Sequence, residues 1–498
     1  MKRHTPALLL QRLFLVLFVI MATLLVGYAI YHPCQRLWPL KSFTLVILIL
    51  IILGTLGLLT YYLHHWSAIH LHLLSLFNLG LIVILACLAL YYFKAQPHWD
   101  AIICSNTAYH LYPQFNWHDV TAYEHNYALN DYPNNLGLIY FEACFFKLLA
   151  FLNIHFSITQ AYYYLPPLNI FLLISSLWLA YRLLQRHCHA YVAALFTVLS
   201  LLMSAFFPAV TIFYTDYPAM LVIMLMLTCY DQLLTTHAWR YLLLLGLITI
   251  IGVIIKFNIF IVLIGITIHY ALTHNWRQWL GKLMLLWLSL IILIPVTNTA
   301  LRLSTGTPAA KYGMPVIHWP LMSLNASGGY TDAGEAYTER LKARYPKQTV
   351  AKIETKQYID IWKHQPQRVW RALQAKVSWV YSEGTYQSLK YCLVSPLHQP
   401  RGLLKYCYGS QRGYFIYWCS AFNLVVWLIV LGGVWYRLFQ RHLTITFWDV
   451  ALISVFGNML FLLFWEANSR YMFAFLPMLL MLASVSLGSF FSKEKDVI

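Results

Sequence analysis

The sequence predicts an all-α polytopic membrane protein, and two observations lead to that fold class. Hydrophobic residues make up 60% of the 498-residue chain and charged residues only 10%, whereas a soluble domain carries about 25% charged residues. Apolar runs of about 20 residues, the length that a helix needs to cross a bilayer, recur from one end of the chain to the other. A soluble enzyme built around one buried core is therefore excluded.

Twelve apolar segments are expected to span the membrane, which would leave both ends of the chain on the same side. They cover 7–30, 40–63, 70–93, 160–183, 189–209, 216–235, 241–255, 257–272, 279–301, 414–437, 446–465 and 471–491. The first is too long for a signal peptide and lacks a small-residue cleavage site, so we expect it to stay as the first helix.

Basic residues between these segments set the expected orientation, because short cytoplasmic loops are rich in lysine and arginine. The residues expected in the cytoplasm are Lys2, Arg3, Arg182, Arg186, Arg240, Arg277, Arg437, Arg441, Lys493 and Lys495. Arg36 and Lys41 fall on the outer side and run against this rule. The net charge of +17 is thus attributed to topology and anionic lipid headgroups rather than to nucleic acid.

The stretch 135–154 is apolar enough to be a thirteenth span. However, it contains Glu142 and Lys147, and counting it would place Arg182 and Arg186 outside. We expect it to lie along the external interface as an amphipathic helix, with the thirteenth span as the alternative.

Two hydrophilic regions, 94–159 and 302–413, then lie outside the membrane. The expected division is into additional N-terminal helices, a helical core that includes the first external loop, an extracytoplasmic cap and the C-terminal helices. These regions are 1–66, 67–301, 302–413 and 414–498.

Several polar motifs, far apart in the sequence, converge on the outer face under this topology. They contain Asp100, Tyr132, Asn134, Asn135, Tyr214, Asp216, Lys256, Arg470 and Tyr471. A carboxylate at the interface can accept the proton of a hydroxyl group, and Lys256 and Arg470 can hold a phosphate. Most of these residues alone are as compatible with a helix cap, a turn or a lipid contact. Lys256 is the exception, because it is the only Lys, Arg, Asp or Glu between Arg240 and Arg277. Together they favour transfer from a lipid-linked, negatively charged donor.

The order of these features resembles the GT-C superfamily of polytopic glycosyltransferases, especially the branch of the protein mannosyltransferases and aminoarabinose transferases. Asp100, the 135–154 helix, the basic end YRLLQR (181–186), Asp216 and Lys256 follow that pattern. More narrowly, four motifs resemble uncharacterised membrane glycosyltransferases of Gram-positive bacteria. They are YPNNLGL (132–138), FYTDYP (213–218), HW with GGYTD (318–319, 328–332) and RYMFAFLP (470–477).

The resemblance implies a GT-C-like fold of about 12 transmembrane helices and a glycosyltransferase that takes its sugar from polyprenyl phosphate. By position, Asp100 is expected to be the general base and Asp216 to assist it, with Lys256 and Arg470 on the donor phosphate. The expected substrate contacts are Tyr132, Asn134, Asn135, Tyr214, His318, Trp319 and Tyr471. The expected acceptor is a cell-envelope glycan or teichoic-acid-type polymer on the extracytoplasmic face of a bacterial plasma membrane.

One departure disfavours a protein acceptor. Ala101 follows Asp100, where protein mannosyltransferases have a paired Asp-Glu. Three other functions stay open: a flippase for lipid-linked glycan, a polymerase or ligase that uses polyprenyl diphosphate, and a non-catalytic partner of another transferase. The absence of a sequence repeat counts against the flippase. A diphosphate enzyme would need more than two outer cations.

No cofactor is certain, and a divalent metal is left open. Four histidines in the first external region, His98, His110, His118 and His125, match no defined metal-ligand spacing. Among the nine cysteines there is no CxxC pair, and only Cys392 and Cys407 are candidates for a disulfide.

Overall fold

The computed structural model describes residues 5–304, 313–440 and 443–491, and their secondary structure is helical apart from one isolated bridge between Ala95 and Pro396. Eight helical spans in this part of the chain are long and apolar enough to cross a membrane. They contain α1 (Thr5–Tyr31), α2 (Ser42–His64), α3 (Ala68–Tyr92), α8 (Pro166–His187), α11 (Asp216–Thr236), α14 (Trp276–Ser304), α21 (Gly413–Leu438), and η6 (Ser469–Phe475) with α23 (Leu476–Phe491). The prediction of a polytopic helical membrane protein is confirmed.

The remaining four predicted spans are also apolar helices, but shorter ones. They are α9 (Ala190–Leu202), α12 (Trp239–Ile255), α13 (Phe260–Thr273) with the turn η5 (Phe257–Ile259), and α22 (Trp448–Phe464). That all twelve cross the bilayer stays a prediction. Among the residues expected in the cytoplasm, Lys2, Arg3, Arg441, Lys493 and Lys495 lie outside the described residues, as do residues 305–312 of the predicted cap.

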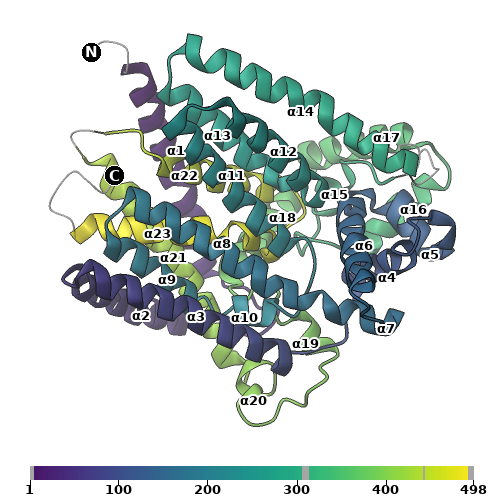
Figure 1. Ribbon diagram of the computed structural model, residues 1–498, viewed down its shortest axis with the longest axis horizontal. Helices are drawn as coiled ribbons and strands as arrows, with labels where there is room; N and C mark the ends of the chain where they lie inside the picture. The colour runs from purple at the N-terminus through teal and green to yellow at the C-terminus, as the bar shows by residue number, and fades with distance from the viewer. Residues whose placement is uncertain (1–4, 305–312, 441–442, 492–498) are drawn as a thin grey trace.

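The long helices differ in how much of their apolar surface is covered by protein. In the most apolar window of Ser469–Phe491, 89% of the residues are buried, whereas in Leu280–Thr297 only 17% are. A helix that is apolar on all sides belongs either in a protein core or against lipid. Accordingly, η6 and α23 form the centre of the bundle, and α14 runs along its edge (Figure 1).

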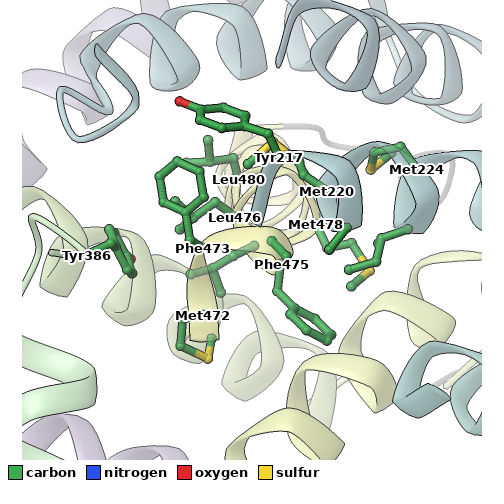
Figure 2. Packing of buried hydrophobic residues seen from close by; sticks show 14 of the residues in the cluster. Tyr217, Met220, Met224, Tyr386, Met472, Phe473, Phe475, Leu476, Met478 and Leu480 are labelled. Atoms are coloured by element: carbon green, nitrogen blue, oxygen red, sulfur yellow. The ribbon is translucent and has the colours of Figure 1, made fainter. Parts of the chain in front are cut away.

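The core packs around Phe473 of η6, which joins elements that are distant in the sequence. Its ring lies 5.1 Å from Tyr217 of α11, 5.6 Å from Phe206 and 6.1 Å from Tyr386, measured between ring centroids. Figure 2 shows Tyr386, Phe473 and Tyr217 in this cluster. Buried aromatic pairs of this kind stabilise by about 0.5–1.5 kcal/mol beyond their area. They fix the start of α11 and the start of the last span relative to each other.

The two predicted external regions gather at one end of the bundle, away from the two ends of the chain (Figure 1). The first contributes α4 (Trp99–Leu111), α5 (Ala122–Asn126), α6 (Leu136–Phe151) and α7 (Ile158–Ala161), and the second contributes α15 (His318–Met322), α16 (Asp332–Lys342) and α17 (Lys347–His364). The next helix, α18 (Pro366–Ser382), packs against α1, α21 and α22 and so belongs partly to the bundle. The predicted cap is therefore continuous with the helical core.

Helix α6 corresponds to the ambiguous stretch 135–154. It has 16 residues, is shorter than the eight long spans and runs across their direction beside α4 (Figure 1). Its orientation agrees with an interfacial helix, and its depth in a bilayer stays a prediction. The suggested disulfide is absent, because both cysteines are free thiols. Cys392 instead donates to the carbonyl oxygen of Phe93 over 3.0 Å.

Candidate active site

Asp100 stands at the start of α4, where the helix dipole favours a negative charge. Its Oδ1 accepts a hydrogen bond from the Tyr127 hydroxyl at 2.8 Å. The Tyr214 hydroxyl lies 3.4 Å from Oδ2, but that hydroxyl also donates to the Asn135 side-chain oxygen at 2.9 Å. A hydroxyl has only one proton to donate, so the shorter contact to Asn135 leaves Oδ2 of Asp100 weakly engaged.

Asn135 completes this network, because its amide nitrogen donates to the Tyr127 hydroxyl at 2.8 Å. The amide is 2% exposed and sits where η3 (Pro133–Asn135) joins α6. Asn135 and Tyr214 thus lie beside Asp100, as predicted. Asn134 is exposed and contacts the Asn135 side chain at 3.3 Å.

Asp216 opens α11 and pairs with both predicted phosphate-binding cations. Lys256 Nζ lies 2.5 Å from its Oδ1, and Arg470 Nε lies 3.5 Å from its Oδ2. The three side chains are only 10% to 22% exposed. One carboxylate between two cations leaves one positive charge uncompensated. Asp216 is therefore engaged in ion pairs, whereas Asp100 has only hydroxyl partners among the described residues.

Breaks between helices determine the positions of Lys256 and Arg470. Helix α12 ends at Ile255, and Lys256 takes an extended conformation (φ −154°, ψ 112°) before η5 begins. At the other break, the Asn468 side chain caps η6 by accepting from the backbone N–H of Arg470 at 3.0 Å. The Arg470 guanidinium lies 4.9 Å from the ring centroid of Tyr214.

Tyr471 faces Lys256, whose ammonium lies 5.4 Å from its ring centroid. Cation–π contacts of this kind hold a cation without neutralising it. Tyr471 therefore supports the predicted cation pair and lies within the candidate site.

The cap meets the first external region at Tyr132. Its ring lies 5.0 Å from Tyr127 and 5.8 Å from Trp319, and its hydroxyl donates to Glu335 of α16. Tyr132 and Trp319 therefore form an aromatic wall next to Asp100, and their contact with a substrate stays a prediction. His318 does not join it. That side chain is 1% exposed and bonded to Thr338 over 2.7 Å inside the cap.

Two charged residues at this site were missed by the sequence analysis. Glu466 is 6% exposed, in the loop between α22 and η6, and accepts from the Tyr471 hydroxyl at 3.4 Å. Lys390 opens α19 (Lys390–Val394), and its ammonium lies 3.8 Å from the ring centroid of Trp99. Glu466 could have been found as an isolated acid four residues before Arg470. No pattern in the sequence points to Lys390.

Burial shifts the titration of both groups. It raises the pKa of Glu466 to about 7, although the charge of Arg470 and the hydrogen bond from Tyr471 oppose that shift. It lowers the pKa of Lys390 to about 8, and the positive charge of Arg470 adds to that effect. Both groups also interact electrostatically with Asp100. The site therefore contains a carboxyl group poised near neutral pH in addition to Asp100 and Asp216.

The described residues contain no group of three or more histidine, cysteine, aspartate or glutamate side chains placed to hold a metal ion. His110, one of the histidines considered for such a site, pairs with Glu124 at 2.8 Å. In this part of the chain, the histidines of the first external region therefore form no metal site.

Residues 148–300 match the family model of the dolichyl-phosphate-mannose-protein mannosyltransferases. The matched region extends from the last turn of α6 through most of α14 and includes Tyr214, Asp216 and Lys256. Asp100 and Arg470 lie outside it. No curated protein matches the chain.

Proposed function

Because residues 148–300 match the family model of the dolichyl-phosphate-mannose-protein mannosyltransferases, we propose that the chain is a GT-C membrane glycosyltransferase. It transfers a sugar from a polyprenyl-phosphate donor to a cell-envelope glycan or teichoic-acid-type acceptor. The reaction takes place on the extracytoplasmic face of a bacterial plasma membrane. The acceptor class rests on the resemblance of the four motifs and on Ala101, which occupies the place of the second acid of protein mannosyltransferases.

The proposal rests on the different surroundings of Asp100 and Asp216. Asp216 is held between Lys256 and Arg470, so its charge is used to orient cations. Asp100 is hydrogen-bonded to Tyr127, and within the described parts of the chain its Oδ2 has only the 3.4 Å contact to Tyr214. A carboxylate oxygen without a strong partner can accept a proton. Asp100 is therefore the general base, and Asp216 is a positioning residue.

The reaction is a single displacement. The acceptor hydroxyl gives its proton to Oδ2 of Asp100 while its oxygen bonds to the anomeric carbon of the sugar. The bond from that carbon to the donor phosphate oxygen breaks, and its electron pair leaves with the phosphate. Attack from the side opposite the phosphate inverts the anomeric configuration.

Lys256 and Arg470 stabilise the departing phosphate. They share Asp216 and keep one net positive charge, which matches the negative charge that develops on the leaving group. An arginine binds phosphate through two parallel hydrogen bonds and a lysine as a point charge. The polyprenyl chain lies against the apolar bundle, with its phosphate at the level of the break between α12 and η5.

The acceptor approaches from the side of the cap. Tyr132 and Trp319 form an aromatic wall there, and the two oxygens of Glu335 accept from the hydroxyls of Tyr132 and Tyr330. Aromatic faces beside polar groups suit the apolar and hydroxylated faces of a sugar ring. This wall is the acceptor subsite of the proposal.

The test is the transfer of radiolabelled sugar from polyprenyl phosphate by the wild type and by Asp100→Asn at matched expression. Loss of the base is expected to lower the transfer rate by about 10²- to 10⁴-fold while donor binding persists. Asp119→Asn is the matched control, because Asp119 belongs to the same external region but is exposed.

Wild-type transfer by Asp100→Asn would refute the assignment of the base. An equal loss in Asp119→Asn would show that the assay does not report on the site. If the wild type moved the labelled lipid between leaflets without transferring its sugar, the flippase alternative would replace the proposed reaction.

A further inference from the structure

Trp99 has a backbone conformation that bulky side chains rarely adopt. Its φ is +53°, although it is followed directly by Asp100 at the start of α4. A non-glycine residue in the left-handed region costs about 1–3 kcal/mol and occurs mainly at functional sites. The ring is 44% exposed and stacks on Tyr391 with centroids 5.5 Å apart. The strained backbone thus holds this ring beside the candidate base.

Lys390 approaches the same ring from a second element. Its ammonium lies 3.8 Å from the Trp99 ring centroid, and among the described residues it has no carboxylate within ion-pair distance. Its charge interacts with Arg470, Asp100 and Glu466. A lysine with an aromatic ring but no paired carboxylate remains available to bind an anion.

A buried carboxylate builds the turn that presents Lys390. Glu383, 3% exposed, accepts from the backbone N–H groups of Thr385 and Gln387 at 3.1 Å and from the hydroxyl of Ser469. Gln387 has φ of +57°, as does its neighbour Tyr386 with +52°. The same carboxylate therefore holds the turn before Lys390 and the residue before Arg470. Glu383 thus fixes the backbone positions of both Lys390 and Arg470.

The charges of the site divide into two groups. Asp216 with Lys256 and Arg470 forms the group that the proposed function assigns to the donor phosphate. Lys390 belongs to a different group, because its ammonium lies over the Trp99 ring and interacts electrostatically with Arg470, Asp100 and Glu466. The site therefore has a third cation, Lys390, which the proposed function does not assign to the donor phosphate.

We propose that Lys390, held against Trp99 beside Asp100, binds a second phosphate group of the bound substrates. This inference rests on the proposed function, since it takes the first phosphate to be that of the donor. The group belongs either to a phosphate-bearing acceptor or to a donor that carries a diphosphate in place of the monophosphate of the proposed function. In both cases the ligand chemistry is a phosphate within reach of Lys390 and Arg470.

Binding of non-reacting probes separates these sources. Farnesyl phosphate and farnesyl diphosphate, which carry no sugar, are titrated calorimetrically into the purified full-length protein in neutral detergent. A second-phosphate site for the donor predicts that the wild type binds the diphosphate about tenfold more tightly, the lower end of what a charge-assisted hydrogen bond supplies. Lys390→Met is expected to lose this preference, and Lys390→Arg to keep it.

The matched control is Lys405→Met. Lys405 also makes a cation–π contact, 4.9 Å from the ring centroid of Tyr406, but it lies on α20 (Leu404–Cys407), which Figure 1 shows away from α4. Its removal is expected to leave both affinities unchanged. Retained farnesyl phosphate binding in Lys390→Met also shows that the variant is folded.

If the wild type shows no preference for the diphosphate, glycerol 3-phosphate is titrated in the presence of farnesyl phosphate. Binding that depends on Lys390 assigns the second phosphate to the acceptor. Wild-type behaviour of Lys390→Met with all three probes overturns the inference, and so does an equal loss for both farnesyl ligands. Failure of the wild type to bind farnesyl phosphate at all contradicts the proposed function instead.

Discussion

Replacing Asp216 by asparagine removes the carboxylate that Lys256 and Arg470 share. Its oxygens lie 2.5 Å from Lys256 Nζ and 3.5 Å from Arg470 Nε. Breaking a buried ion pair on one side costs about 3–5 kcal/mol, because it leaves an unpaired charge. These side chains retain 10% to 22% exposure, so the lower end applies. We expect Asp216→Asn to lower the free energy of unfolding by about 3 kcal/mol.

The same change is expected to strengthen the binding of a phosphate, because two cations are then left without their carboxylate. Farnesyl phosphate should bind Asp216→Asn about tenfold more tightly than the wild type, which corresponds to about 1.4 kcal/mol. Sugar transfer should nevertheless fall, since Lys256 and Arg470 lose the group that orients them.

Unfolding in mixed micelles with increasing sodium dodecyl sulfate measures the first effect, and titration calorimetry measures the second. Asp119→Asn, at an exposed aspartate, is the control for loss of one negative charge. Unchanged stability of Asp216→Asn, or weaker binding of farnesyl phosphate, would refute the reasoning that Asp216 competes with the donor phosphate for the same two cations.

Two further predictions concern the surroundings of the site. Because burial raises the pKa of Glu466 to about 7, its carboxyl group is neutral below that pH and adds a negative charge near the donor phosphate above it. The donor KM of the wild type should therefore rise as pH increases through 7, and Glu466→Gln should flatten that rise. A wild-type profile in Glu466→Gln would contradict the assignment. Gly384→Ala should lower stability by about 1–3 kcal/mol, since a Cβ there would lie 2.1 Å from the Cys419 carbonyl oxygen. Gly27→Ala is the control and should not lower stability, because a Cβ at Gly27 would have no neighbour within 4 Å. Equal melting temperatures of the two variants would count against the close approach of Gly384 to Cys419.

Hydropathy and charge were sufficient to predict the apolar helices and the proximity of Asp216, Lys256 and Arg470. Apolar runs bounded by loops leave few alternatives to spanning helices, and residues at the outer ends of such helices are brought to one face. Asp216, Lys256 and Arg470 were placed together for this reason. Their pairing could not be predicted, because the order along the chain does not say which side chains point toward one another.

The residues that the sequence analysis misplaced or missed depend on packing. His318 and Trp319 are adjacent in the sequence, but the fold buries the first in the cap and turns the second toward Tyr132. Lys390 reaches the site through a turn with two non-glycine residues at positive φ. Such a conformation is imposed by the hydrogen bonds to Glu383 and has no signal in residue type.

The loop between the two N-terminal helices contacts the segment that precedes the turn at Glu383, and this contact gives the two helices a structural role. The loop between α1 and α2 contacts the end of α18, because the backbone N–H of Cys34 donates to the Ser382 hydroxyl at 2.7 Å. The guanidinium of Arg36 lies 3.3 Å from the ring centroid of Trp379. Ser382 immediately precedes Glu383.

This contact also accounts for Arg36, one of the two basic residues that run against the charge rule. Arg36 donates to the backbone oxygen of Ser327 at 2.8 Å as well as lying over Trp379, so it is engaged with the cap rather than with lipid headgroups. The first two helices thus brace the segment from which Glu383 organises the turn before Lys390 and holds Ser469 beside Arg470. We infer that they support the geometry of the cation cluster without contributing a residue to it.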